Sequence, residues 1–330
     1  MNLTLGITNR CNYDCKHCGV ESGLHDRRRL TVEEMKDYID QAAAMQDEGL
    51  KISITGGEPF LCFEDVVEII AHAKTKKAQR IGLVTNCHWA TSYDLAIRKL
   101  KTLQQAGLSA ISFSVDEFHL QNVPIENVRT AFRAAADLDI YVGIKVVVFK
   151  DSSRAADFAR EMQDLTLGRT ISIEEIPCLP VGRARSLPDE MFLYTPGLPQ
   201  GRCHGLGGFV VECDGTFFTC CVPGWPKRLS CGNARHQSIA DMVDHASNTS
   251  FLLTMRANGP AYFVPFFEEA GVPIARDRFV SECHLCQTLL TAADESPQGE
   301  AALQAASQAW FAKQADMGNA LSVIAELVCE

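Results

Sequence analysis

The sequence contains no apolar run near the roughly 18 residues that a membrane-spanning helix needs. No charged and then apolar signal peptide opens it either, so neither a membrane protein nor a secreted one is expected. Basic side chains are scarce, because 31 Lys and Arg stand against 41 Asp and Glu, for a formal net charge of −10. The longest basic run is Arg27-Arg28-Arg29, which argues against a nucleic-acid surface. These absences predict a cytoplasmic protein that binds neither membranes nor nucleic acid.

Cysteine, by contrast, is abundant, with 14 in 330 residues. In a reducing compartment these thiols stay reduced, and metal binding is then a common use for them. With 46% hydrophobic residues the chain can bury a large core, and its length exceeds one average domain. We therefore expect a metal-binding catalytic domain with a smaller module attached.

Three of the cysteines stand together near the start, as Cys11, Cys15 and Cys18 in the run CNYDCKHC. A [4Fe–4S] cluster usually takes four cysteine ligands, so a set of three leaves one iron open to a ligand that is not protein. Zinc is the alternative, because Cys-x2-Cys pairs often bind zinc and His17 lies inside the motif. The spacing alone leaves both open.

A second motif, Gly56-Gly57-Glu58-Pro59, follows the apolar stretch Lys51–Thr55. The two glycines let the backbone approach a ligand closely, and the proline stiffens the turn. The carboxylate of Glu58 can accept hydrogen bonds from an ammonium group. A zinc site does not need such a turn, so the second motif favours the iron–sulfur cluster.

Apolar, β-branched runs recur at close to thirty residues along the first 180, which is the length of a βα unit. The predicted strands are Leu3–Ile7, Lys51–Thr55, Arg80–Thr85, Ala110–Val115, Tyr141–Phe149 and Ile171–Ile176. The predicted helices run from a capping box at Thr31 and Glu34 to about Glu48, and over Phe63–Lys77, Ser92–Ala106, Ile125–Leu138 and Ser153–Asp164. The repeat predicts an α/β fold with a parallel sheet.

The spacing Cys-x3-Cys-x2-Cys, followed about forty residues later by GGEP, resembles the signature of the radical S-adenosylmethionine (radical SAM) superfamily. The resemblance spans most of residues 5 to 290. It implies a partial (β/α)6 TIM-like barrel over residues 1–185 and a [4Fe–4S] cluster on the three cysteines. In this family the open iron binds SAM, and cleavage of SAM gives a 5′-deoxyadenosyl radical that abstracts a substrate hydrogen.

The same resemblance implies which residues contact SAM. All lie at or just after the carboxyl ends of predicted strands, where barrel enzymes build their sites. The GGEP turn would hold the amino group, Ser114 and Asp116 the ribose, and Ile176 and the backbone carbonyl of His17 the adenine. The implied SAM-binding residues are His17, Gly56, Gly57, Glu58, Pro59, Asn86, Ser114, Asp116 and Ile176.

Four further cysteines lie beyond residue 200, namely Cys203, Cys220, Cys283 and Cys286. Four thiolates can close a second cubane or hold zinc. Their order resembles the twitch or SPASM extension of radical SAM maturases, which implies an auxiliary [4Fe–4S] module over residues 186–290. Within it, Val211–Thr219 predicts a β-hairpin with a type I′ turn at Asp214-Gly215. Whether Cys220 or Cys221 is the ligand stays open, and residues 291–330 predict a C-terminal helical segment.

Relatives of this kind modify peptides, so the resemblance implies a ribosomally made peptide substrate and an external electron donor such as flavodoxin or ferredoxin. The expected outcome is epimerisation of L to D residues or formation of a crosslink. In epimerisation a spare thiol, Cys221 with Cys231 in reserve, would return a hydrogen atom to the substrate. The alternatives are a radical SAM dehydrogenase of a small molecule, and an iron–sulfur electron-transfer or zinc-scaffold protein without SAM chemistry.

Overall fold

The computed structural model describes residues 1–45, 49–203, 208–220, 224 and 226–316. Within these ranges nine strands form one sheet, in the order β6-β5-β4-β3-β2-β1-β7-β8-β9. The strands are β1 Asn2–Gly6, β2 Lys51–Thr55, β3 Arg80–Thr85, β4 Ala110–Ser114, β5 Tyr141–Val148, β6 Ile171–Pro177, β7 Gly208–Val211, β8 Thr216–Phe218 and β9 Ser230–Asn233.

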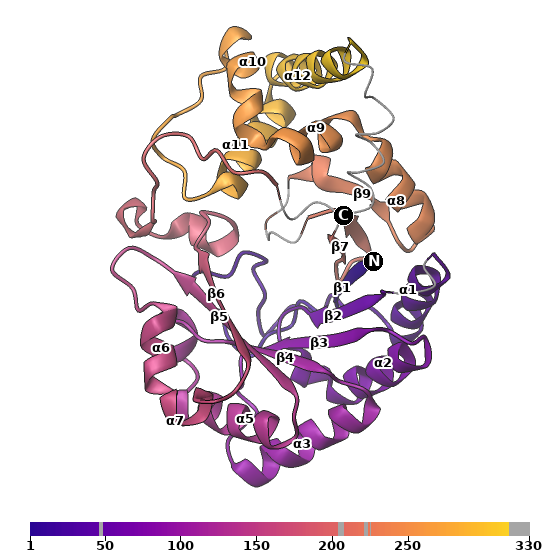
Figure 1. The fold of residues 1–330 in the computed structure, drawn as a ribbon, viewed down its shortest axis with the longest axis vertical. Coiled ribbons are helices and arrows are strands. Elements are labelled where there is room, and N and C mark those ends of the chain that lie inside the picture. Colours follow the sequence, from indigo (N-terminus) through magenta and orange to yellow (C-terminus); the bar gives the residue numbers. More distant parts are fainter. Residues whose placement is uncertain (46–48, 204–207, 221–223, 225, 317–330) are drawn as a thin grey trace. The chain divides into compact units, whose positions relative to one another are not determined.

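Twelve α-helices accompany the sheet in the same described ranges (Figure 1). They are α1 Val32–Ala44, α2 Phe63–Thr75, α3 Tyr93–Ala106, α4 Glu117–Leu120, α5 Ile125–Asp137, α6 Ala155–Glu161, α7 Gln163–Thr166, α8 Ile239–Asn248, α9 Ser250–Asn258, α10 Val264–Glu269, α11 Glu282–Glu295 and α12 Pro297–Asp316. None of the helices described has the length and hydropathy needed to cross a membrane.

The chain forms two compact units. The first unit comprises Met1–Phe192 with Val210–Thr216, and the second comprises Leu193–Phe209 with Phe217–Glu330. In the first unit β1 to β6 pair in parallel with their neighbours, in sequence order. The six strands predicted from periodicity are therefore confirmed, and their connections form the predicted α/β, TIM-like arrangement.

The two faces of this parallel sheet differ in character. One face carries the buried apolar residues of β1 to β5, packed under helices that lie on the outer side of the sheet in Figure 1. The opposite face carries small or polar residues, namely Thr4, Ser53, Gly82, Ser112, Gly143 and Ser172. A cavity of about 220 Å³ lies along this face, and Thr4, Ser53, Gly82 and Ser112 belong to its lining, together with the longer side chains of Lys51, Arg80 and Lys145. The first unit is therefore packed on its outer side and hollow on its inner side.

Two local predictions in the first unit need correction. The helix predicted over Ser153–Asp164 is broken at Met162 into α6 and α7. The short helix α4, which follows β4 directly, was missed because four residues are too few to show helical periodicity. The capping box was predicted correctly, since Thr31 and Glu34 each accept a hydrogen bond from the other's backbone N–H.

The second unit is mainly helical. Helix α12 contacts α9, α10 and α11, and Leu303, Ala306 and Trp310 on α12 are buried. These three residues lie in the helical segment predicted for residues 291–330, of which residues 317–330 lie outside the described residues. Arg228 forms ion pairs with Asp294 and Glu300, across the junction of α11 and α12.

The predicted hairpin forms between β7 and β8, but its turn type is different. A type I′ turn requires positive φ at both central residues. Gly215 has a φ of +86°, whereas the described residues Cys213 and Asp214 do not take positive φ. The Glu212 N–H donates to the Thr216 carbonyl, at 2.9 Å, which leaves a three-residue loop closed by a left-handed glycine. The sequence signal located the hairpin and overlooked the extra residue.

The GGEP turn packs directly on the backbone that leads into the three-cysteine loop. Gly57 N–H donates to the Thr8 carbonyl at 2.6 Å, and Glu58 N–H donates to the Arg10 carbonyl at 2.9 Å. A Cβ on Gly57 would lie 2.2 Å from the Arg10 carbonyl oxygen, and one on Gly56 would lie 2.4 Å from the Thr8 oxygen. Both glycines are therefore required by close backbone approach.

This contact predicts a large difference between two glycine substitutions. Gly57→Ala must push backbone apart and is expected to lower the free energy of unfolding by about 3 kcal/mol. Gly82→Ala is the matched control, because its Cβ would meet its nearest neighbour at 3.9 Å, and its effect should stay within about 1 kcal/mol. Denaturant unfolding of both variants measures this, and equal losses would contradict the close approach at Gly57.

Candidate active site

The three cysteines of the motif lie in the loop between β1 and α1, with Cys11 and Cys15 buried and Cys18 half-buried. Burial raises the pKa of Cys11 to about 11, with Glu58 and Cys18 adding to the rise against backbone hydrogen bonds that lower it. Burial, then Cys11 and Asp116, raises the pKa of Cys15 to about 12. The thiols therefore lie close enough to influence one another. Such a set favours a cationic metal group, which would replace the protons.

Two asparagine amides point at these sulfur atoms from other loops. Asn86 Nδ2 lies 3.9 Å from Cys11 Sγ, and Asn122 Nδ2 lies 3.8 Å from Cys15 Sγ. Hydrogen bonds to cysteine sulfur are a normal second shell of iron–sulfur clusters. The donor set and its surroundings thus fit a cluster. Asn86 was predicted as a SAM contact, and the structure places it against the cysteine loop.

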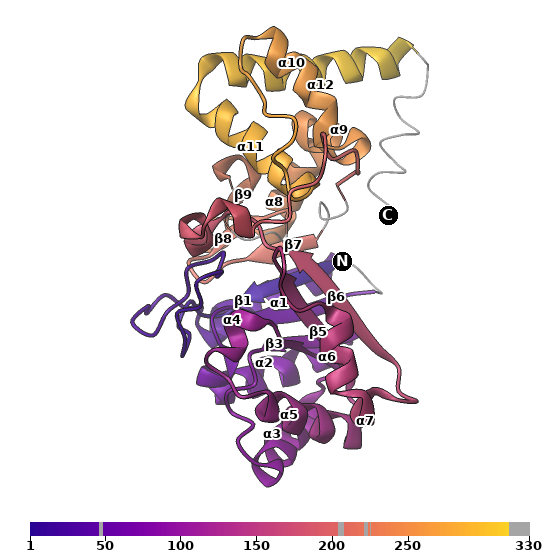
Figure 2. The ribbon, with the colours of Figure 1, turned by 90° about the vertical axis from the view of Figure 1, so that its left-hand side faces the viewer.

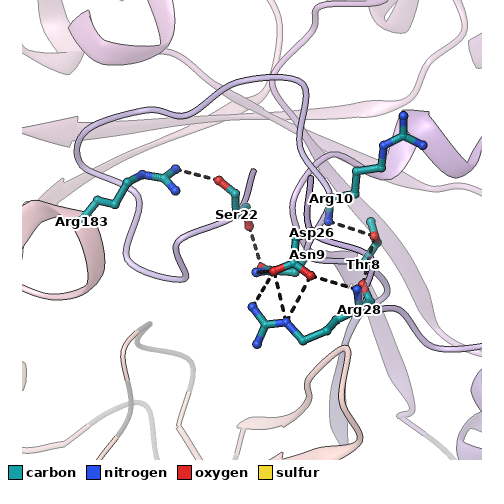
Figure 3. Close-up of polar contacts among 7 residues, drawn as sticks. All are labelled: Thr8, Asn9, Arg10, Ser22, Asp26, Arg28 and Arg183. Atoms are coloured by element: carbon teal, nitrogen blue, oxygen red, sulfur yellow. Dashed lines mark hydrogen bonds and ion pairs between the residues drawn. The ribbon is translucent and has the colours of Figure 1, made fainter. Parts of the chain in front are cut away.

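A buried polar network keeps this loop in shape (Figure 3). Asn9 Nδ2 donates to Asp26 Oδ2 at 2.7 Å, and Ser22 Oγ donates to Asn9 Oδ1 at 2.8 Å. Arg28 Nη2 lies 2.6 Å from Asp26 Oδ2. Hydrogen bonds from Arg28, and then from Asn9, outweigh burial and hold the pKa of Asp26 well below its usual range. These contacts join the two ends of the loop.

Arg183 fastens the same loop from the far end of the barrel. It lies in the 3₁₀ turn Gly182–Ser186, after β6. Its Nε donates to the Cys15 carbonyl at 3.0 Å and its Nη2 to the Ser22 carbonyl at 2.8 Å. A Cβ on Gly182 would lie 2.6 Å from the Cys18 carbonyl oxygen. The sequence assigned no role to Arg183, because only the folded barrel brings it to the loop.

Glu58 is fully buried, and its carboxylate is already engaged within the protein. One oxygen accepts from Phe60 N–H at 3.0 Å and Thr85 Oγ1 at 2.8 Å, and the other accepts from Asn86 N–H at 2.8 Å. Burial raises its pKa to about 7 against these hydrogen bonds. Glu58 was predicted to accept from a ligand ammonium. In the structure its hydrogen bonds link the GGEP turn, with its buried Pro59, to the end of β3.

Asp116 and two histidines form a compact buried cluster after β4. Asp116 Oδ1 caps α4 by accepting from the N–H groups of Phe118 and His119, at 3.1 and 3.0 Å. Asp116 Oδ2 lies 2.7 Å from His119 Nδ1 and 3.5 Å from His17 Nε2. Burial would raise the pKa of Asp116, but His119 and then His17 outweigh it and hold the pKa well below its usual range.

His17 also presents an unpaired atom, because its buried Nδ1 has no hydrogen-bond partner among the residues that the structure describes. Its ring stacks on Phe118 at 5.1 Å between centroids. The sequence predicted a role for its backbone, and the structure shows that the imidazole is part of the site. His119 was missed, since α4 was missed. Ser114 and Ile176 are half-buried at the ends of β4 and β6, on the rim where they were predicted.

The second cysteine set assembles in the other unit. Cys283 and Cys286 lie one turn apart on α11. Burial, then Cys203, Cys220 and Cys283, raises the pKa of Cys286 well above its usual value. All four predicted residues therefore come together. Cys221 lies outside the described residues. Cys231 is buried in β9, and burial alone raises its pKa to about 11.

One carboxylate that the sequence did not single out belongs to the first unit. Glu212 follows β7, and a Cβ built on Gly6 would lie 3.1 Å from Glu212 Oε2. Burial and then Asp214 raise the pKa of Glu212 to about 7, while the Cys213 N–H and Arg28 oppose the rise. Gly6 is the last residue of β1, so Glu212 stands at the carboxyl end of the barrel strands.

This carboxylate makes the stability of the protein depend on pH. Between the ordinary pKa near 4.5 and about 7, the folded protein holds a proton that the unfolded chain has released. Stability therefore falls as pH rises through that window. Glu212→Gln removes the free-energy cost of ionising a buried carboxylate. The substitution should raise the free energy of unfolding by about 2 kcal/mol at pH 8, after allowance for partial exposure, and by less at pH 5.

Urea unfolding of the anaerobically reconstituted protein at the two pH values measures the effect. Glu161→Gln, which changes an exposed carboxylate on α6, is the control and should show the same small difference at both. A gain for Glu212→Gln that does not depend on pH would contradict a raised pKa.

Comparison with known proteins adds independent findings. The model of the Radical SAM superfamily matches residues 5–154. YydG of Bacillus subtilis, named as a proposed peptide biosynthesis protein, is 25% identical over 315 residues, covering 89% of this chain and 93% of YydG. Human molybdenum cofactor biosynthesis protein 1 is 32% identical over 272 residues, covering 78% of this chain and 40% of that protein.

Solved structures support the fold. The tagged anSMEcpe structure with bound AdoMet aligns with a TM-score of 0.54 at 16% sequence identity, over 74% of this chain and 80% of that one. The family match covers the stretch that holds both the three-cysteine loop and the GGEP turn. The structure places the three thiols close together on a loop that packs against that turn, inside the matched stretch, and residues 5–154 thus form a radical SAM domain.

Proposed function

We propose that this protein modifies a ribosomally made peptide by radical SAM chemistry, and that its product is an epimerised, D-configured residue. In this proposal Cys11, Cys15 and Cys18 hold the SAM-binding [4Fe–4S] cluster. Cys203, Cys220, Cys283 and Cys286 hold an auxiliary [4Fe–4S] cluster. When bound, the first cluster and SAM supply a 5′-deoxyadenosyl radical able to abstract hydrogen from an unactivated C–H bond.

The observation that carries the proposal is the environment of the three thiols. Amides of Asn86 and Asn122 face two of the sulfurs, and Arg183 donates to the Cys15 backbone carbonyl. These groups orient the ligand loop and place hydrogen bonds at sulfur, which tunes the reduction potential of a bound cluster. A zinc scaffold has no need of the GGEP turn that is packed against the same loop.

The auxiliary site is supported by the neighbours of Cys286. Three further thiols lie close enough to Cys286 to raise its pKa, and one of them is Cys220. This favours Cys220 as the ligand and leaves the adjacent Cys221 as a spare thiol. Four thiolates could also hold zinc, so metal content is the deciding measurement.

A peptide substrate is supported by the likeness to YydG, which runs through nearly the whole of both chains. Epimerisation is proposed as a balanced step within that class. The deoxyadenosyl radical takes a hydrogen atom from the peptide Cα and becomes 5′-deoxyadenosine. A thiol S–H, proposed as that of Cys221 with Cys231 in reserve, returns a hydrogen atom from the opposite face and becomes a thiyl radical. One electron from the external donor and one proton from water then restore the thiol.

The cluster assignments predict a defined loss in a triple variant. Replacing Cys11, Cys15 and Cys18 by Ala should abolish formation of 5′-deoxyadenosine from SAM, because no ligands remain for the first cluster. The same variant should keep about four irons per chain after anaerobic reconstitution, as one cubane requires. Mass spectrometry of the nucleoside and iron analysis test the two halves. Retained SAM cleavage would overturn the first assignment, and zinc without iron would overturn the second.

The reaction type predicts an isotope pattern. With a peptide substrate found among short reading frames beside the gene, turnover in D2O should place one deuterium at an inverted Cα, because a thiol hydrogen exchanges with solvent. Cys221→Ala should lose deuterium and inversion, yet still form 5′-deoxyadenosine. A product lighter by two hydrogens would instead show a crosslink or double bond, with the second electron passed to the auxiliary cluster. Unchanged inversion in Cys221→Ala and Cys231→Ala would also reject the proposal.

A further inference from the structure

The loop that carries the three cysteine ligands is positively charged, although the chain as a whole is strongly negative. Residues 9–29 contain five cations, and the same stretch contains three anions. The loop therefore has a net charge of +2 in a chain with a formal net charge of −10. The cations are Arg10, Lys16, Arg27, Arg28 and Arg29. Such a local reversal of sign attracts anionic partners.

Three of these cations are available to a partner. Arg28 pairs with Asp26, and Arg29 pairs with Asp65 of α2. By contrast, no ion pair within the described part of the chain involves Arg10, Lys16 or Arg27, and all three are exposed. Their charges are thus neither neutralised by a neighbour nor buried.

The available cations lie on the same loop as the buried thiols. Lys16 lies between the ligands Cys15 and Cys18 in sequence, and Cys18 is more exposed than the other two cysteines. Leu24, on the same loop, is 46% exposed. In Figure 2 this part of the chain forms the indigo loops that extend to the left of β1. An apolar residue among unpaired cations, directly outside a redox group, is what a small and transient electron-transfer interface needs.

We propose that the outer face of the cysteine loop, made of Arg10, Lys16, Arg27 and Leu24, is the docking surface for an acidic one-electron donor protein of the flavodoxin kind. This inference rests on the proposed function, because only a cluster on Cys11, Cys15 and Cys18 requires an electron at this position. Docking here brings the donor to the side of the loop where Cys18 approaches solvent, so the electron passes from the reduced flavin to the cluster over a short path.

The charge pattern favours an acidic occupant, because unpaired cations on the loop attract a negatively charged partner, and the cluster proposed beside them needs an electron from a separate donor. It also separates docking from substrate binding. The cavity on the inner face of the sheet is lined by residues such as Thr4, Ser53 and Ser112, and none of the four exposed residues of the proposed surface belongs to its lining.

The experiment compares two reductants with the full-length, anaerobically reconstituted enzyme. The rate of 5′-deoxyadenosine formation is measured with a reduced, acidic bacterial flavodoxin and, separately, with dithionite, which needs no docking surface. Lys16→Glu/Arg27→Glu should lower the flavodoxin-driven rate about tenfold or more at low ionic strength, and the difference should shrink in 0.5 M salt. The dithionite-driven rate and the iron content should stay within about twofold of the wild type.

Two further variants sharpen the test. Arg98→Glu/Lys101→Glu reverses two exposed cations on α3 and should leave both rates unchanged, which excludes an effect of total charge. Lys16→Gln/Arg27→Gln removes charge without adding repulsion, so its flavodoxin-driven rate should fall between those of the wild type and the reversed variant.

Several results would overturn the proposal. An equal fall with both reductants would mean that the substitutions damage the site itself, and an unchanged flavodoxin-driven rate would place docking elsewhere. A loss of peptide turnover under dithionite, with normal flavodoxin-driven SAM cleavage, would assign the surface to an acidic peptide instead. Failure of the proposed function is distinguishable, because the wild type would then form no 5′-deoxyadenosine with dithionite.

Discussion

The site depends on how an irregular loop of about twenty residues is held in one conformation. Backbone polar groups in such a loop need partners outside regular strands and helices. Within the loop, Asn9 and Gly23 exchange backbone hydrogen bonds with neighbouring segments, and the Asn9 side chain links those of Ser22 and Asp26. From the segment after β6, Arg183 donates to the Cys15 and Ser22 carbonyls. Because Arg183 follows the last barrel strand and the loop follows the first, the ligand geometry requires the whole half-barrel to be folded.

The buried carboxylates serve the same end. Glu58 and Asp116 lie at strand ends, where a ligand contact is expected. The oxygens of both carboxylates accept hydrogen bonds from backbone N–H groups and contact neighbouring side chains. The turns after β2, β3 and β4 are fixed by them. Preorganisation of this kind keeps the loops from rearranging when a reactive radical is generated, which limits side reactions.

The two units divide the chemistry. The first holds the three-cysteine loop and a hollow inner face, and Glu212 adds a carboxylate with a pKa near 7 at the end of β1. The second gathers four thiols around α11. In the proposed function an external electron is needed at the first set, and the unpaired cations of its loop are suited to attract an acidic donor, in a chain with a formal net charge of −10.

The sequence alone determined the six parallel strands, the Thr31 cap, the hairpin after residue 207 and both cysteine sets, because periodicity, capping and ligand spacing are local patterns. It did not determine the type of the hairpin turn, the break at Met162 or helix α4, since each depends on one or a few residues. Only tertiary structure decided the partners of Glu58 and Asp116, the inclusion of His17 and His119 in one cluster, and the reach of Arg183 to Cys15. A hydrogen bond between residues 168 positions apart follows from closing the barrel in space, and no local pattern encodes it.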